Sequence, residues 1–128
     1  MQFTEIGLLA VGAVVGALLR FKLVESPVLL GGLQVNVLVV NILGSFILGA
    51  FSAASLRFNL DARYSLLVAV GFCGSFTTMS SFALETSNLI DGNRFSLAAL
   101  NVLANVGLSL GAIIGGRAVV AAIVDNVS

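Results

Sequence analysis

The charged residues of this chain are spaced so that they leave four long uncharged runs between them. A helix needs about 20 mostly apolar residues to cross roughly 30 Å of hydrocarbon. The last two runs fit one span each, and the second also has room for a connecting segment ahead of its helix. The four runs are Ile6 to Leu19, Ser26 to Leu56, Tyr64 to Leu84 and Phe95 to Gly116.

This pattern predicts an all-α membrane protein, because 59% of the 128 residues are hydrophobic and only 9% are charged. Soluble domains carry about 25% charged residues. We expect one four-helix transmembrane domain over residues 1–128, with helices at about 4–24, 33–56, 64–90 and 95–122 and both termini on the same side. The second run would contain a re-entrant segment around Pro27 and the Gly31-Gly32 pair, and the short first run forces Arg20 and Lys22 to snorkel or to be buried.

Several classes of function are disfavoured by what the chain lacks. The net charge is zero, which gives no electrostatic reason to expect nucleic acid as a partner. No histidine is present to act as a base or a metal ligand, and the single cysteine, Cys73, excludes an internal disulfide. No basic stretch precedes the first apolar run, so we expect that run to stay in the mature protein as a helix. The sequence does not predict an enzyme.

Small residues predict close contacts between the helices. Gly12 and Gly16 form a G-x-x-x-G step that leads to Arg20 on the same helical face. In lipid, such steps let helix backbones approach one another. Further glycines lie along the second and fourth predicted helices, at Gly44, Gly49, Gly107, Gly111, Gly115 and Gly116.

Amide and hydroxyl side chains recur inside the predicted spans. Asn101, Asn105 and Ser109 follow one another at steps of four and therefore share a helical face, as do Asn41 and Ser45. Buried amides are costly unless they form hydrogen bonds or face water, and this leaves two interpretations of these side chains. They form hydrogen bonds between helices, or they line a hydrophilic path whose neutral donors suit a weakly held anion.

The third predicted helix has an unusual centre, with two glycines and five hydroxyl residues between positions 71 and 82. One interpretation is a broken helix, interrupted at about Gly74 to Thr78, whose freed carbonyls need partners such as a bound cation. The other is a bent helix whose hydroxyls bond to carbonyls one turn earlier. The physics of the sequence leaves both open.

Three segments resemble the Fluc (CrcB) family of fluoride channels, and the resemblance runs over essentially the whole chain. They are the glycine step ending at Arg20, the segment Val39–Phe46 around Asn41, and the segment Gly71–Phe82 followed by Glu85. The last of these is the most specific. The resemblance implies an inverted, dual-topology homodimer in the cell membrane that exports toxic fluoride passively through two pores around a central sodium ion.

Site residues follow from the same resemblance. Gly74 and Thr77 match the positions whose backbone carbonyls bind the structural sodium at the dimer axis. Glu85 matches an acid near the pore mouth, and Arg20 matches the arginine at the end of the first helix. The implied anion pathway comprises Asn41, Phe82, Met79, Ser81, Asn105 and Ser109.

Three positions depart from the family pattern. Met79 stands where the first of two pore phenylalanines is usual, and it offers polarizable bulk without a ring edge. Val37 replaces a threonine that is common one turn before Asn41, and Ser75 replaces a glycine beside the sodium site. These departures affect the expected conduction of fluoride more than they affect the assignment of the chain to this family.

Two other functions compete with a channel. A small proton-coupled multidrug or guanidinium exporter has a similar size, but it needs a carboxylate deep in the membrane. Here Glu5 precedes the first span and Glu85 lies near the end of the third. A non-transporting assembly subunit is the other alternative, in which the aligned amides serve only to hold helices together.

Overall fold

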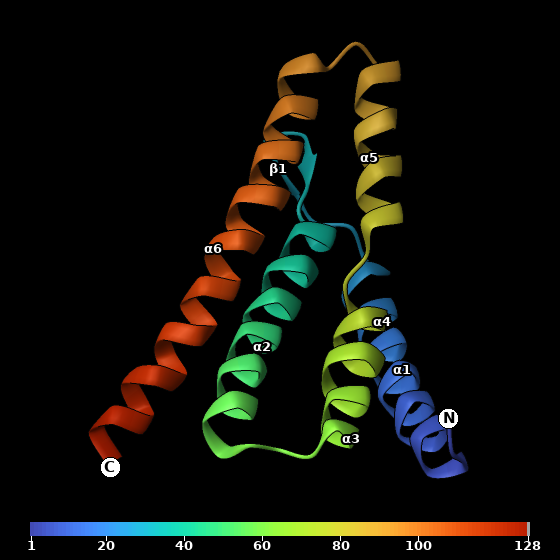
Figure 1. Cartoon of the computed structure of the whole chain (residues 1–128). Coiled ribbons are helices and arrows are strands. Elements are labelled where there is room, and N and C mark those ends of the chain that lie inside the picture. Colours follow the sequence, from blue (N-terminus) through green and yellow to red (C-terminus); the bar gives the residue numbers. More distant parts are fainter. Residues whose placement is uncertain (128) are drawn as a thin grey trace.

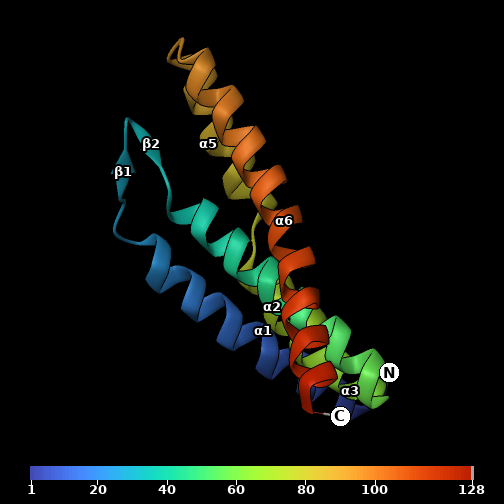
Figure 2. The ribbon, with the colours of Figure 1, turned by 90° about the vertical axis from the view of Figure 1, so that its left-hand side faces the viewer.

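The computed structural model describes residues 1–127, and it contains four helical spans long and apolar enough to cross a membrane. Three of them are the continuous helices α1 (Phe3–Val24), α2 (Asn36–Phe58) and α6 (Phe95–Val127). Both termini lie at the same end of the bundle (Figures 1 and 2). The prediction of an all-α, four-span membrane protein is therefore confirmed.

The third span, Ala62–Asp91, is built from several pieces. It begins with α3 (Ala62–Ser65), continues as the π-helical segment η1 (Leu66–Cys73) and α4 (Gly74–Phe76), and ends with α5 (Met79–Asp91). Between α4 and α5 the backbone is extended, with ψ at 158° for Thr77 and φ at −149° for Thr78. Of the two interpretations, the interrupted helix is the one found, and the interruption lies at these two threonines. Back-bonding is present as well, because the Thr77 hydroxyl donates to the Cys73 carbonyl over 2.8 Å.

The segment between α1 and α2 differs from the expected re-entrant segment. It is a small antiparallel hairpin of β1 (Leu29–Leu30) and β2 (Leu33–Gln34). Its two-residue turn, Gly31-Gly32, has φ of 60° and 89°, which glycine adopts without strain. Since β2 occupies residues 33 and 34, α2 begins at Asn36 rather than at Leu33.

The Asn36 side chain fixes the start of α2 on this hairpin segment. Its Nδ2 donates to the carbonyls of Leu23 and Ser26 over 2.8 and 2.9 Å, and its Oδ1 accepts from the Val28 N–H over 2.7 Å. One amide thus bonds to three backbone groups, one in the last turn of α1 and two in the loop that follows it.

Glycines bring α1 into backbone contact with the third span. A Cβ added to Gly12 would collide with the Leu67 carbonyl oxygen, and one added to Gly16 would collide with the carbonyl oxygen of Phe72. The predicted close packing at this step is confirmed. Figure 1 shows the result, with α1 lying along the α3–α4 half of the third span.

A second glycine contact joins α2 to α6. A Cβ on Gly49 would meet the Ile113 carbonyl, and one on Gly116 would meet the carbonyl of Phe46. Other glycines of α6 face open space within the described part of the chain: Gly107, Gly111 and Gly115 have nothing within 4 Å of such a Cβ. Glycine content alone therefore does not identify the contacts.

Candidate functional site

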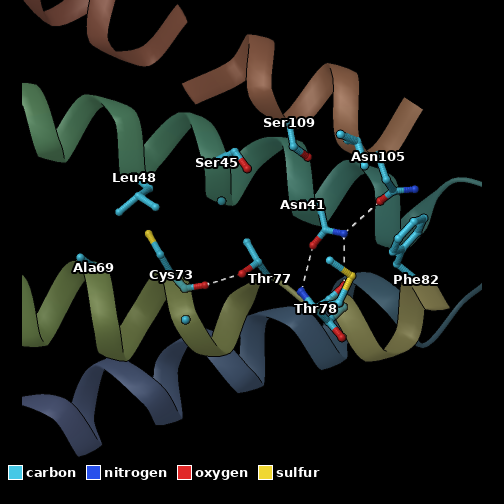
Figure 3. Close-up of a pocket in the computed structure, with 14 residues that line it drawn as sticks. Asn41, Ser45, Leu48, Ala69, Cys73, Thr77, Thr78, Phe82, Asn105 and Ser109 are labelled. Carbon is cyan, nitrogen blue, oxygen red and sulfur yellow. Dashed lines mark hydrogen bonds between the residues drawn. The ribbon is translucent and has the colours of Figure 1, made fainter. Parts of the chain in front are cut away.

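A cavity of about 360 Å³ opens where the third span is interrupted. Its walls come from α2, from both sides of the break and from α6 (Figure 3). Asn41 and Ser45 both line it, as their shared helical face predicted. The other lining residues are Gly44, Leu48, Ala69, Cys73, Gly74, Thr77, Thr78, Met79, Phe82, Asn105, Val106 and Ser109.

Asn41 closes the break by pairing with the peptide groups of Thr78. Its Oδ1 accepts from the Thr78 N–H over 2.9 Å, and its Nδ2 donates to the Thr78 carbonyl over 3.2 Å (Figure 3). The second Nδ2 hydrogen goes to Asn105 Oδ1 at 3.0 Å. The asparagine therefore supplies the donor and the acceptor that a continuous helix would have supplied to this residue.

The hydrogen bonds continue from Asn105 along α6. Asn105 Nδ2 donates to both the backbone carbonyl and the Oδ1 of Asn101, each over 3.0 Å. Asn101 Nδ2 then donates to Thr86 Oγ1 over 3.1 Å. Asn101 and Asn105 are only 1% and 4% exposed. For these amides the structure shows the interhelical hydrogen bonds of the first interpretation.

Ser109 is different from the two asparagines on its face of α6. Its Oγ is buried and has no hydrogen-bond partner within the described part of the chain, although it lines the cavity. Buried hydroxyls without a partner are uncommon and call for an explanation. None of the described residues that line the cavity is charged. The site thus offers a free hydroxyl in neutral surroundings.

At the break, two backbone N–H groups donate to other acceptors than the carbonyls to which they would bond in a continuous helix. In a continuous α-helix the N–H of Thr78 would bond to the carbonyl of Gly74, and that of Ser81 would bond to Thr77. Here the Thr78 N–H donates to Asn41 and the Ser81 N–H donates to Thr78 Oγ1 over 3.2 Å. The predicted sodium ligands, the carbonyls of Gly74 and Thr77, are thus among those that lose their usual helical donors at the break.

The aromatic and thioether residues of the implied pathway lie on α5. Phe82 is half-buried and is seen at the same end of the cavity as Asn41 and Asn105 (Figure 3). Met79 lines the cavity but is 71% exposed. Val37, which replaces the usual threonine, is 2% exposed and does not line this cavity. Ser81 does not line it either.

The two charged residues of the prediction lie elsewhere. Glu85 lines a second cavity of about 590 Å³, between the hairpin and the α5–α6 end of the bundle, together with Gln34, Asn88 and Arg94. Its Oε1 is buried and has no hydrogen-bond partner in the described residues. Arg20 is half-buried near the end of α1 and lines neither cavity.

Two threonines of this arrangement were missed in the sequence. Thr78 caps α5, and its hydroxyl accepts from the backbone of Ser81, three residues later. A threonine at the start of a helix is an N-cap signal that could have been found in the sequence. Thr86 lies two helical turns after Thr78 and so shares its face, but the spacing does not show that Asn101 is its partner.

Comparison with known proteins supports the resemblance. The family model described as CrcB-like protein, Camphor Resistance (CrcB), matches residues 7–117. A protein of Nitrosopumilus maritimus named fluoride-specific ion channel FluC is 52% identical over 126 residues, which is 98% of this chain and 100% of that protein.

Two further relatives carry the same name. The protein of Methanococcus maripaludis is 37% identical over 113 residues, covering 88% of this chain and 93% of its own length. That of Sulfurihydrogenibium is 43% identical over 104 residues, covering 79% and 84%. With matches of this extent, the chain belongs to the CrcB family of membrane proteins.

Proposed function

We propose that this multi-pass membrane protein is a fluoride-selective ion channel that exports fluoride by passive electrodiffusion. The relatives' shared name supports fluoride as the ion. The observation that carries the proposal is the buried, unpartnered hydroxyl of Ser109 in an uncharged cavity. A hydroxyl hydrogen is a good donor to a small anion, and the absence of a fixed cation lets that anion leave again.

Phe82 gives the cavity a second means of attracting an anion. The edge of an aromatic ring carries partial positive charge, so an anion in the ring plane is held without a hydrogen bond. Asn41 and Asn105 lie at the same end of the cavity, and their amides are already engaged with each other. On this proposal, fluoride passes Phe82 and the Ser109 hydroxyl. As it passes, the Asn41 amide gives up one of its present hydrogen bonds and donates to fluoride instead.

The test of function is release of anions from liposomes that contain the purified protein. We expect fluoride efflux, followed with a fluoride electrode, to far exceed chloride efflux at the same gradient. Release of guanidinium driven by a pH gradient, without fluoride efflux, would indicate the exporter. No transport of either ion would favour an assembly subunit.

A homodimer is proposed because residues on both sides of the polar break are exposed on the protomer's surface. Gly74 is exposed, and Met79 is 71% exposed, close to the extended backbone of Thr77 and Thr78. Irregular backbone is tolerated at membrane depth only where protein or water covers it. A second copy of the chain is the proposed cover, with two pores formed between or within the paired subunits.

The two subunits are proposed to be inverted, because basic residues give the chain no preferred orientation. One end of the bundle holds Arg20, Lys22 and Arg94, and the other holds Arg57, Arg63 and Arg117. Orientation follows the excess of Lys and Arg on one side, and here the tally is three against three. Counting without Arg20 and Arg117 leaves two against two, so the balance does not depend on these two residues.

A reporter fused after Ser128, which lies outside the described residues, tests this topology. We expect comparable amounts on the two sides of the membrane, because neither end has a basic surplus. Adding two lysines at the Asn93 turn is the matched control, and it should shift the population to one side. A reporter found almost wholly in the cytoplasm without that change would require the inverted dimer to be abandoned.

A structural sodium ion at the dimer axis fits the carbonyl groups of the break. Gly74 and Thr77 have lost their usual helical donors, and carbonyl oxygens are ligands that suit a hard cation. Each subunit would contribute two carbonyls, and the ion would neutralise their partial charges where two breaks meet.

Two substitutions at Thr77 separate a backbone role from a side-chain role. Thr77→Ser should leave fluoride efflux within about twofold, because serine keeps the hydroxyl bond to Cys73 and the backbone carbonyl. Thr77→Pro should reduce efflux at least about tenfold, since it removes the N–H that donates to Cys73 over 3.1 Å and disfavours the helical conformation of Phe76.

The φ of Thr77, −80°, is close to that of proline, so φ itself is not the cause of the expected loss. Replacing sodium by a larger organic cation during purification provides the independent check, and it should destabilise the wild-type dimer. Equal efflux by Thr77→Pro and the wild type would contradict the proposed site.

A further inference from the structure

Helix α5 carries Phe82 to the cavity, yet no residue of α5 is buried in the protomer. In lipid, close packing and interhelical hydrogen bonds hold helices in place, and close packing contributes little where no residue is buried. The short extended link at Thr77 and Thr78 also separates α5 from the first half of its span. Some other interaction must therefore determine where the Phe82 ring lies.

Polar contacts attach α5 at two points, one turn before Phe82 and one turn after it. The N–H and C=O of Thr78 bond to Asn41, and the hydroxyl of Thr86 accepts from Asn101. Because 78, 82 and 86 follow at steps of four, all three positions share one face of the helix. Phe82 lies midway between the two attachments.

Three asparagines, Asn41, Asn105 and Asn101, connect these two attachments, and we refer to them as the amide chain. One continuous series of donors runs through it in a single direction, from the Thr78 N–H at one end to Thr86 Oγ1 at the other. Asn41 Nδ2 makes one further bond, back to the Thr78 carbonyl. The Thr86 hydroxyl hydrogen completes the series by donating to the carbonyl of Phe82 over 2.9 Å. Turning over any one amide would place donor against donor or acceptor against acceptor.

We propose that Thr86 and Asn101 are positioning residues that, through the amide chain, hold α5 against α6 and so hold the Phe82 ring at the cavity. Neither residue lines the cavity, so neither contacts the ion. The effect on fluoride rests on the proposed function, whereas the effect on the ring does not. Thr78 and Thr86 are therefore connected in two ways, through two turns of α5 and through the hydrogen bonds of the amide chain.

Burial makes the Thr86 attachment sensitive to a small change. Asn101 is 1% exposed, so its Nδ2 has no access to water if the Thr86 hydroxyl is removed. An unpaired buried donor shifts a local equilibrium by a factor of ten or more. The relief available to the molecule is to move α5 away from α6, which displaces Phe82.

The test compares two replacements of Thr86, one that removes the hydroxyl and one that keeps it. We expect Thr86→Val, which keeps the branched side chain and removes the hydroxyl, to lower fluoride efflux from liposomes about tenfold. Thr86→Ser keeps the hydroxyl, so its fluoride efflux should be close to that of the wild type. Thr4→Val is the matched control, because it makes the same chemical change at the exposed start of α1. Its fluoride efflux should equal that of the wild type.

The position of the ring is measured separately, by ¹⁹F NMR of protein labelled with 4-fluorophenylalanine. The signal of Phe82 is identified by its loss in Phe82→Leu. It should shift or broaden in Thr86→Val and keep its wild-type position in Thr86→Ser and Thr4→Val. A wild-type ring signal in Thr86→Val would overturn the positioning role, whatever the flux.

A double-mutant cycle with Asn101→Leu tests whether the two residues act as one connection. Thr86→Val should have no further effect on the ring signal or on efflux in an Asn101→Leu background, because the bond between them is already lost. Full additivity would overturn the proposal. If the wild-type protein releases no fluoride, the proposed function fails, and the ring signals alone decide the positioning role.

Discussion

Replacing Asn41 by aspartate is expected to abolish fluoride efflux, to below about one hundredth of the wild-type rate. The side-chain amide donates to the Thr78 carbonyl and to Asn105 Oδ1, and a carboxylate can donate to neither. Two buried acceptors would face a third, and each lost bond costs about 1–3 kcal/mol. The added negative charge would also repel an anion in the cavity that Asn41 lines.

The measurement is efflux from liposomes, combined with size-exclusion chromatography to show that the variant still assembles. Asn126→Asp is the matched control, because it makes the same chemical change on the exposed C-terminal part of α6. It should transport fluoride as the wild type does. Undiminished efflux by Asn41→Asp would remove this residue from the pathway and contradict its role at the break.

A single methyl group at Gly16 is expected to destabilise the fold by about 3 kcal/mol or more. A Cβ there would collide with the Phe72 carbonyl and lie 3.1 Å from the Phe76 N–H. Both groups belong to the backbone, so no side-chain rotation relieves the clash, and overpacking of this kind usually costs 1–3 kcal/mol even when side chains can move. Helix α1 would have to separate from the third span just before the break.

Gly7→Ala provides the control on the same helix, because a Cβ at Gly7 has nothing within 4 Å. Alanine is the better helix former by about 1 kcal/mol, so this variant should be as stable as the wild type or slightly more stable. Thermal unfolding in detergent measures both variants. A Gly16→Ala protein that unfolds at the wild-type temperature would show that α1 does not pack on η1 and α4 as described.

Much of the fold was predictable because its causes are local in the sequence. The spacing of charges gave the four spans, since the number of residues needed to cross hydrocarbon is fixed by helix geometry. Asn59 and Asn93, in the connections between spans, adopt positive φ, a conformation that asparagine tolerates better than most residues do. Glycines and hydroxyls at the centre of the third span left a break and a bend both open, and they located either one to within a few residues of Thr77 and Thr78.

The hairpin was not predicted, although its signal was present. Gly31-Gly32 is a two-residue hairpin turn, but the flanking strands have only two residues each. So short a strand pair has little pattern of its own, and the bonds of Asn36 to the loop help to stabilise it.

What the sequence by itself determined is the number of spans, the irregular centre of the third one and the set of polar residues inside the membrane. Only the tertiary structure decided how those polar groups pair. Asn41 bonds to residues 37 and 64 positions away, and Asn101 to one 15 positions away. Such pairings depend on the depth and rotation of each helix, which packing of small residues sets in lipid. For that reason the amides could be grouped by face from the sequence, but only the assembled bundle distinguishes the bonded Asn105 from the unpartnered hydroxyl of Ser109.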